Sequence, residues 1–351
     1  MISIDRADLS FHLHDVIGTE RLRSMPRYGD YDRETIDGIL DTAERIAMEH
    51  FLPHAALLDR NEPKFVDGKV EMDPAVGAAL AVYREAGFFG AGFDQEWGGA
   101  QMPESVRVAT SFMFSAANVS TAGYPFLTIG AANLIATFGS AEQKERFLRP
   151  MIEGRFFGTM CLSEPQAGSS LSDIATRAEP AGDGTYRLFG RKMWISGGDQ
   201  EISENIVHLV LAKIPGGPAG VKGISLFIVP KHEVLDGGGI GERNGVTLAG
   251  LNHKMGYRGT TNTLLHLGED RPCVAVHLWI DASGKLRRHQ FRRGVMRSAA
   301  RLTYEQVQAA RDGNPDKTTR PLLNSVITPL YGAYQSLLKG RPARDALELE
   351  M

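Results

Sequence analysis

The chain has 351 residues, a length that fits two or three compact units. A hydrophobic fraction of 42% and a charged fraction of 23% are those of an ordinary globular protein. Only two cysteines are present, so a disulfide framework and a cysteine-based zinc site are excluded, and no metal site is expected. The first residues carry acids and histidines instead of a signal sequence, and no run reaches the ~20 apolar residues of a membrane span. We expect a cytoplasmic protein without a membrane partner.

The net charge of −3 hides an uneven distribution along the chain. Residues 271–351 hold 14 Lys and Arg against 7 Asp and Glu, whereas residues 1–270 hold 25 against 35. Such asymmetry indicates two parts of different character, which are best interpreted separately.

The first part begins with a predicted helical domain over residues 31–154. Residues 1–30 are polar and broken by glycine and proline, which predicts an irregular N-terminal extension. From residue 31 onward, apolar residues recur at steps of three and four, which is the period of a helix. Further helices are predicted from Pro74, over 104–119, over 125–138, and from a capping box at Ser140 and Gln143 to about Gly154.

The hydrophobic period changes near Gly154. Short runs rich in β-branched and aromatic residues follow, divided by Gly, Pro and Asp. They predict strands over 156–163, 185–196, 206–213 and 223–230, with weaker ones over 177–180 and 245–251. We expect a loop at 236–245, and an antiparallel β domain over residues 155–269.

The basic C-terminal part, residues 270–351, predicts an α+β fragment. Residues 273–281 and 286–293 flank Ala282-Ser283-Gly284, which is typical of a hairpin. Helices are predicted over 297–311 and about 320–338.

Two segments carry the residues of chemical interest, MCLSEPQAGSS at 160–170 and RKMWISGG at 191–198. Small and hydroxyl residues stand there at the ends of predicted strands, an arrangement that offers N–H groups and hydroxyls to a planar polar ring. Trp194 could lie along one face of such a ring while Ser196 reaches its edge. Neither segment fits a glycine-rich phosphate loop.

The order of these motifs resembles the acyl-CoA dehydrogenase family over about residues 31–269. A helical domain is followed by L-S-E-P-Q-A-G-S, then K-M-W-I-S, then H-K-M-G-Y-R-G. In their form, the motifs are similar to those of the larger, extended members of the family. This branch includes methylthioalkanoyl-CoA dehydrogenases. The resemblance implies non-covalently held FAD, an acyl-CoA thioester as substrate, an electron-transfer flavoprotein or another acceptor as partner, and a homo-oligomer, although the last is in doubt here.

The resemblance also implies the positions that contact the cofactor: Cys161, Leu162, Ser163, Ser169, Trp194, Ile195 and Ser196. Of these, Ser169 would also contact the acyl-CoA, and Ser196 would lie near flavin N5. Two alternatives stay open. Ser163 and Ser169 could be ordinary strand and turn hydroxyls, and Trp194 could be a core aromatic. We interpret Cys161 as a buried small residue and Glu164 as structural. Ser170 departs from the family, in which many members carry Asp there.

In the family, the base that takes the Cα proton is a glutamate of a C-terminal four-helix domain. After Asp270 the sequence predicts no such domain, so no catalytic residue is assigned. We therefore expect a truncated acyl-CoA dehydrogenase-like flavoprotein with little or no α,β-dehydrogenation.

The C-terminal part resembles the interior of the catalytic domain of the ribonuclease R and II superfamily over about 271–349. The resemblance rests on HLWIDASGKLRRHQF, MRSAARLTYEQVQ and PLLNSVITPLYGAYQSLL. Members bind single-stranded RNA in a basic channel, so an RNA-binding fragment on an inert scaffold is one alternative function. A non-functional fused reading frame is another. We interpret the arginines as solvated charge and do not expect an RNA partner.

Overall fold

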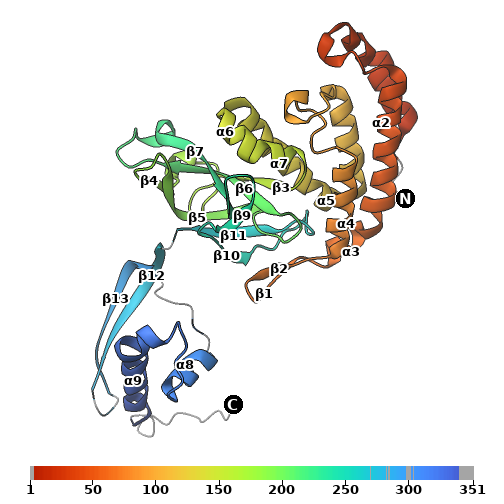
Figure 1. Cartoon of the computed structure of the whole chain (residues 1–351). Coiled ribbons are helices and arrows are strands. Elements are labelled where there is room, and N and C mark those ends of the chain that lie inside the picture. The colour runs from red at the N-terminus through yellow and green to blue at the C-terminus, as the bar shows by residue number, and fades with distance from the viewer. Residues whose placement is uncertain are drawn as a thin grey trace. The chain divides into compact units, whose positions relative to one another are not determined.

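The computed structural model describes residues 4–268, 270–281, 283, 285–297, 302 and 304–339. The chain divides into two compact units, Met1–Gly268 and Glu269–Met351, which are described here separately. Within the first unit, helices gather at one end and a curled sheet at the other, with α5 between the outer helices and the sheet (Figure 1).

The N-terminal extension is helical, so the prediction of an irregular segment is wrong. It contains α1 (Arg6–Ser10), a π-helical turn (Phe11–Val16) and two 3-10 turns (Thr19–Ser24 and Pro26–Tyr28). The side chain of His14 is fully buried, with one ring nitrogen 2.7 Å from Glu20 and the other 3.1 Å from Asp37. Because α2 supplies Asp37, the order of this segment depends on a contact that its own composition does not reveal.

The helical domain contains α2 (Arg33–Ile46), α3 (Ala55–Arg60), α4 (Pro74–Glu85), α5 (Glu104–Phe138), α6 (Ala141–Gln143) and α7 (Arg149–Ile152). The predicted helix from residue 31 is confirmed: Asp32 caps α2 by accepting a bond from Thr35 N at 2.8 Å, and Ile36 and Leu40 are buried. The capping box of Ser140 and Gln143 is also confirmed.

Helix α5 contains a break at Asn118, where φ is −160° and ψ is 91°. The Asn118 side chain accepts a bond from Thr121 N at 3.1 Å and donates one to Phe51 O at 3.0 Å. It therefore caps the second half of α5 and ties the break to the rest of the domain. The helices predicted over 104–119 and 125–138 are thus two arms of one element, which turns at Asn118 without an intervening loop.

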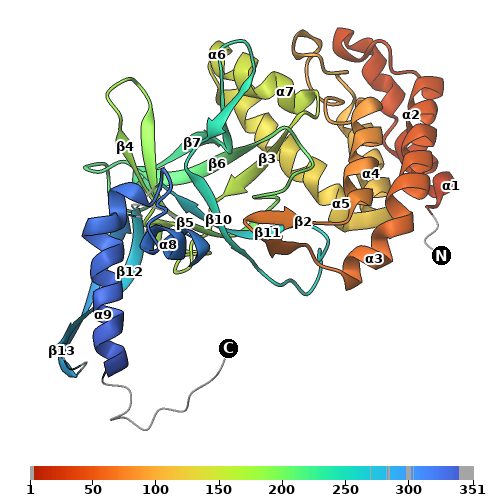
Figure 2. The same ribbon diagram turned by 60° about the horizontal axis from the view of Figure 1, so that its bottom comes forward.

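A two-stranded hairpin interrupts the helical domain, so the prediction that residues 31–154 are wholly helical is wrong. Strands β1 (Lys64–Val66) and β2 (Lys69–Glu71) are joined by Asp67 and Gly68, which both have positive φ. Asp-Gly between short strands is a strong hairpin signal. The hairpin lies beside β10 of the sheet, and Val70 is buried (Figure 2).

Within residues 4–268, seven strands form the main sheet in the order β10-β11-β5-β4-β6-β3, with β7 paired to β6. Their bounds are β3 (Phe156–Cys161), β4 (Arg177–Pro180), β5 (Tyr186–Ser196), β6 (Asn205–Lys213), β7 (Ile224–Pro230), β10 (Val246–Leu251) and β11 (Asn262–Leu267). Each strand predicted from the sequence is present, and β11 was not predicted.

The predicted antiparallel β domain is present, but its sheet also contains parallel pairing. Strands β3 and β6 pair in parallel from Phe156↔Asn205 to Cys161↔Val210. Parallel neighbours need a long crossover, and the chain between these two strands supplies it by forming β4 and β5. The loop expected at 236–245 contains β9 (Ile240–Arg243), which pairs with β8 (His232–Val234).

Strand β3 packs directly against the second arm of α5. Thr128 of α5 accepts a bond from Gly158 N at 3.0 Å. A Cβ at Gly158 would lie only 2.7 Å from the Ala131 Cβ and 2.6 Å from the Met151 Cε, so this approach needs a glycine. The close contact fixes the helical domain on the strand that carries the first motif.

The second unit contains the predicted hairpin, which is confirmed: β12 (Asp270–Ile280) pairs with β13 (Leu286–Arg297). Helices α8 (Tyr304–Arg311) and α9 (Thr328–Lys339) follow, the latter after short helical turns from Arg320. Ala282, Gly284 and most of 298–303, where the sequence predicts the turn and the helix start, lie outside the described residues. The described part of this unit has no set of three long antiparallel helices.

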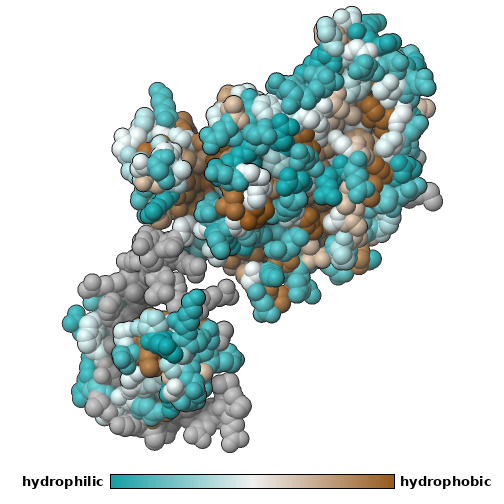
Figure 3. All heavy atoms as spheres, viewed as in Figure 1, coloured by the Kyte–Doolittle hydropathy of each residue, from teal (hydrophilic) through white to brown (hydrophobic). Residues whose placement is uncertain are grey.

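Hydrophilic residues cover most of the face of the first unit that is visible in Figure 3, and hydrophobic residues form separate groups on it. Across the described residues, no helix combines the length and the apolar character that a membrane crossing requires.

Candidate functional site

The two motifs lie at the ends of β3 and β5, which are not paired with each other in the sheet but approach each other there. The Met193 N–H donates to Ser163 O at 2.9 Å, so the segment that leaves β3 lies against β5 immediately before Trp194. Ser163 and Ser196 are half-buried, whereas Trp194 is 53% exposed. The fold therefore brings these two segments together. The convergence of their side chains with Ser169 on one concave surface stays a prediction.

Trp194 occupies a β-bulge in β5. The register with β11 shifts between Lys192 and Ile195, so one additional residue of β5 lies opposite Leu264. The φ angle of Trp194 is 64°, a left-handed conformation that costs roughly 1–3 kcal/mol for a residue with a Cβ. Bulges turn a side chain away from the regular pleat. Its exposure argues against the interpretation of Trp194 as a core aromatic.

Ser196 is fixed by the strand beside it and by the glycines after it. Asn262 Nδ2 donates to Ser196 Oγ at 3.2 Å. Gly197 has a φ of 67°, and a Cβ at Gly198 would lie 2.2 Å from Thr263 Oγ1. The positive φ favours glycine at 197 and the close approach requires it at 198, which lets the chain turn away directly after the serine while β11 stays paired.

The side chains of Cys161 and Ile195 point into the core and are 1% and 2% exposed. Burial raises the pKa of the Cys161 thiol to about 11, so the thiol stays neutral, as expected for a small core residue. The Leu162 carbonyl accepts a bond from Lys192 Nζ at 3.0 Å. At Cys161 and Ile195, only the backbone is left for contact with a ligand.

A buried polar cluster lies beneath the first motif. Thr159 Oγ1 is 2.8 Å from His208 Nδ1, and Cys161 Sγ is 3.9 Å from the same nitrogen. Burial lowers the pKa of His208 to about 4, so its ring is neutral at pH 7. Among the described residues, His208 Nε2 has no hydrogen-bond partner. The side chains of this cluster are therefore uncharged at pH 7 and enclosed by the protein.

Glu164 is engaged within the protein. Its carboxylate accepts bonds from Lys192 Nζ at 2.8 Å and from Thr176 N at 3.1 Å on one oxygen, and from Ala175 N and Gln166 Nε2, both at 2.7 Å, on the other. Burial acts to raise the pKa of Glu164, but these hydrogen bonds outweigh it and hold the pKa below its usual value. This supports the structural interpretation of Glu164.

Ser169 lies in an exposed turn after the first motif, where its carbonyl accepts a bond from Leu171 N at 3.2 Å. A short 3-10 turn, Leu171–Asp173, begins directly after Ser170. The hydroxyls of Ser163 and Ser169 have no hydrogen-bond partner within the described part of the chain. Both hydroxyls are therefore available to a ligand.

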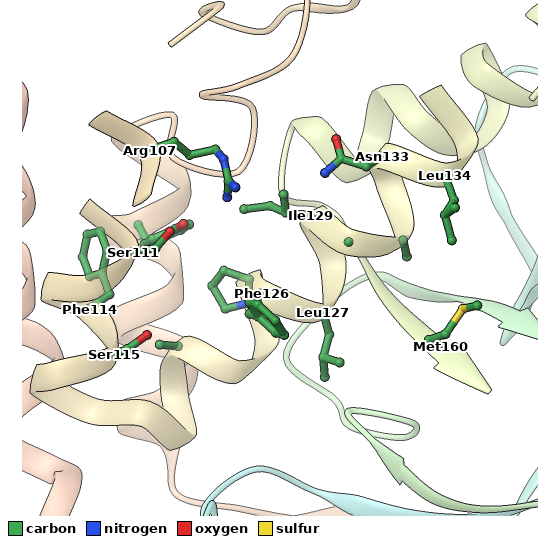
Figure 4. Close-up of a pocket in the computed structure, with 15 residues that line it drawn as sticks. Arg107, Ser111, Phe114, Ser115, Phe126, Leu127, Ile129, Asn133, Leu134 and Met160 are labelled. Carbon is green, nitrogen blue, oxygen red and sulfur yellow. The ribbon is translucent and has the colours of Figure 1, made fainter. Parts of the chain in front are cut away.

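The sequence analysis missed an apolar cavity of about 410 Å³ between the two arms of α5 (Figure 4). Its walls include Phe114, Pro125, Leu127, Ile129, Leu134 and, from β3, Met160. The volume is in the range of small-molecule sites. The cavity depends on the angle at Asn118, and a hydrophobic period alone gives no sign of that angle.

Met160 connects the cavity with the first motif. It lines the cavity, whereas Cys161, the next residue of β3, is packed in the core of the sheet. Successive side chains of a strand point to opposite faces, so this alternation follows from the strand itself. The cavity thus reaches the strand one residue before the segment 161–163 that the resemblance assigns to the flavin.

Both domains of the first unit match families of known proteins. Residues 33–155 match the acyl-CoA dehydrogenase N-terminal domain, and residues 159–269 match the middle domain of the same family. Residues 33–269 belong to the acyl-CoA dehydrogenase family. Residues 234–351 match the RNB domain, so a second family pattern overlaps the end of the first.

Individual acyl-CoA dehydrogenases resemble this chain over a similar stretch. A 3-methylmercaptopropionyl-CoA dehydrogenase of Ruegeria pomeroyi is 33% identical over 258 residues, 74% of this chain and 44% of the relative. A butyryl-CoA dehydrogenase of Syntrophomonas wolfei is 35% identical, over 79% of this chain and 46% of the relative. The chain thus spans less than half the length of these curated relatives.

A solved structure shows the same fold. The acyl-CoA dehydrogenase of Bacillus anthracis in complex with FAD is 26% identical and has a TM-score of 0.54, covering 68% of this chain and 36% of that one. The acyl-CoA dehydrogenase fold is therefore present in the first unit, with its helical domain and curled sheet.

Proposed function

We propose that residues 31–269 bind FAD and an acyl-CoA thioester, with the flavin at the ends of β3 and β5 and the acyl chain in the cavity of α5. The observation that carries this proposal is the continuity through Met160: one strand lines the apolar cavity and then enters the motif at 161–163. A reacting acyl chain and a flavin must meet at one place, and this strand joins the two surfaces.

The residues present fit a planar polar ring. Trp194 offers an exposed indole on a backbone held in a strained conformation, and strain of this kind clusters at ligand sites. The free hydroxyls of Ser163 and Ser169 and the half-buried Ser196 supply polar contacts. The chemistry that FAD supplies in such a site is acceptance of a hydride from the acyl Cβ. The residues of this chain would hold the ring, orient the thioester and keep water from the apolar cavity.

We also propose that the chain dehydrogenates acyl-CoA slowly or not at all. Removal of the Cα proton needs a carboxylate within hydrogen-bond reach, a contribution of ~10²–10⁴-fold in rate. Glu164, the carboxylate within the first motif, accepts hydrogen bonds from five groups of four residues, which keep it ionised. Its role is to hold the motif.

The test is a titration of the purified chain with FAD, followed by flavin absorbance and fluorescence. We expect saturable binding with a shifted flavin spectrum, weakened about tenfold or more by Trp194→Ala because ring stacking is lost. Trp279→Ala, which removes an exposed tryptophan of the second unit, is the matched control. Binding of FAD that is unaffected by Trp194→Ala would contradict the proposed flavin site.

A second candidate function, RNA binding, rests on the hairpin of the second unit. Arg288 stacks on the exposed Trp279, with its guanidinium 4.6 Å from the ring centroid, and Arg287 and His289 are exposed nearby on β13. Aromatic and arginine platforms of this kind stack on single-stranded bases. Fluorescence anisotropy with a labelled oligoribonucleotide tests it: binding that weakens with salt and is lost in Trp279→Ala would support it.

A further inference from the structure

Arg107 is an unexpected member of the acyl cavity. Of the described residues that line this cavity, it alone carries a formal charge. Its side chain is 27% exposed, and Figure 4 shows the guanidinium directed into the cavity from the first arm of α5. A cation beside apolar walls is costly unless an anion or polar groups accompany it.

Glu104, one turn earlier, provides part of that compensation. Arg107 Nε donates to Glu104 Oε2 at 2.7 Å, and Nη2 donates to Oε1 of the same carboxylate. The Glu104 side chain is 70% exposed, and exposed ion pairs contribute little to stability. Within the described residues, Nη1 of Arg107 has no hydrogen-bond partner. Glu104 therefore orients the guanidinium without occupying all of its hydrogen-bond donors.

The wall around Arg107 is also the more polar one. Ser111 and Ser115 follow at successive four-residue steps, so the three side chains share one face of the helix. The facing wall is formed mainly by apolar residues such as Leu127 and Ile129, with Asn133 as its polar member. A ligand that fills this cavity therefore meets one charged, hydrogen-bonding end and one apolar side.

Arg107 and Met160 lie at opposite sides of the cavity (Figure 4). Under the proposed function, the reacting carbons of the acyl chain lie near Met160, because the flavin motif begins at the next residue. The far end of a short acyl chain then lies toward Arg107.

We propose that Arg107 makes this cavity select acyl groups whose far end carries a carboxylate, so that the preferred ligand is the thioester of a short dicarboxylic acid. This inference rests on the proposed function, since it takes the cavity as the acyl site. A carboxylate suits the planar donor fork of arginine, and such charge-assisted bonds are among the strongest in proteins. In a site with little water, the carboxylate of the ligand competes well with the exposed carboxylate of Glu104 for the Arg107 guanidinium.

Anionic oxygens also occur on the phosphates of coenzyme A, and the experiment must separate the two sources. Binding of valeryl-CoA, glutaryl-CoA and free coenzyme A to the full chain, with FAD in excess, is measured by isothermal titration calorimetry. The two thioesters have acyl groups of five carbons and differ in the terminal carboxylate. The variants are Arg107→Met, which keeps the length of the side chain, and Glu104→Gln, which removes the competing carboxylate.

We expect glutaryl-CoA to bind at least about tenfold more tightly than valeryl-CoA, a preference that Arg107→Met abolishes and Glu104→Gln increases. Equal binding of the two thioesters by the unmodified chain would overturn the inference and leave the acyl site intact. A loss of affinity for free coenzyme A in Arg107→Met would show that the arginine binds a phosphate of coenzyme A. This result would also overturn the inference. If neither thioester binds more tightly than free coenzyme A, the proposed acyl site itself fails, and the inference with it.

Discussion

Lys192 Nζ lies 2.8 Å from Glu164 Oε1, and both side chains are buried, at 0% and 2% exposure. The same ammonium donates to Leu162 O, so one cation from β5 holds two successive parts of the segment that leaves β3. Burial lowers the pKa of Lys192, which the ion pair with Glu164 opposes. The pair thus joins the two motifs, and it lies behind the residues proposed to contact the flavin.

Removal of Lys192 should therefore damage both the stability and the ligand site. We expect Lys192→Met to lower the free energy of unfolding by about 3–5 kcal/mol, because an unpaired carboxylate stays buried. Lys192→Met/Glu164→Gln should recover part of this loss, since the uncompensated charge is gone. Chemical denaturation of the unmodified chain, Lys192→Met, Glu164→Gln and the double variant provides the measurement.

The matched control for the buried pair is Arg149→Ala, which breaks the exposed pair of Arg149 and Glu145. That change should cost less than about 1 kcal/mol. If Lys192→Met is as mild as the control, the buried pair does not hold the motifs together.

Acid should destabilise the first unit through His208. Its pKa is about 4 in the folded chain, because burial opposes the charged ring, and about 6.5 when unfolded. Between these values the unfolded chain binds a proton that the folded chain does not. The stability that the folded chain gains by keeping His208 neutral is fully present above pH 6.5 and is lost as the pH falls toward 4. The total loss in the free energy of unfolding is on the order of 3 kcal/mol.

His208→Gln removes this titration, so the unfolding free energy should change less between pH 7 and pH 4.5 than in the unmodified chain. Denaturant midpoints at the two pH values provide the measurement. An unaltered pH dependence in His208→Gln would contradict the assignment.

Gly198 should not tolerate a side chain. The added Cβ of Gly198→Ala would lie 2.2 Å from Thr263 Oγ1, so β11 must shift beside Ser196. We expect a loss of about 1–3 kcal/mol in stability together with weaker FAD binding.

Gly198→Ala/Thr263→Ala removes the clashing atom and should restore part of both properties. Gly250→Ala, where a Cβ meets nothing within 4 Å, is the neutral control. A Gly198→Ala protein that matches this control in stability would show that the close approach is absent in solution.

The break in α5 should depend on Asn118. Asn118→Ala removes the cap of the second arm and leaves Phe51 O without its donor, so we expect a loss of about 2 kcal/mol. The arms would also lose their fixed angle, which should weaken acyl-CoA binding. Asn118→Ser keeps a capping oxygen, so its midpoint of thermal unfolding should lie between those of the unmodified chain and Asn118→Ala. Equal stability of all three proteins would exclude this role.

The sequence by itself determined many of the elements and the family. Apolar residues at helical spacing in α2, the capping box at Ser140 and the change of period near Gly154 are local signals, and each was confirmed. The motifs around Ser163 and Trp194 also carried the family resemblance without any knowledge of the fold. These features depend on neighbours in the chain, which a sequence shows directly.

Only the tertiary structure decided which surfaces meet. The parallel pairing of β3 with β6 joins segments separated by two other strands, and the order of the N-terminal extension depends on Asp37 of α2. The bulge at Trp194 and the angle at Asn118 arise from pairing with β11 and from a bond to Phe51. Because these contacts join residues distant in sequence, no local pattern of hydrophobicity encodes the exposed indole or the apolar cavity.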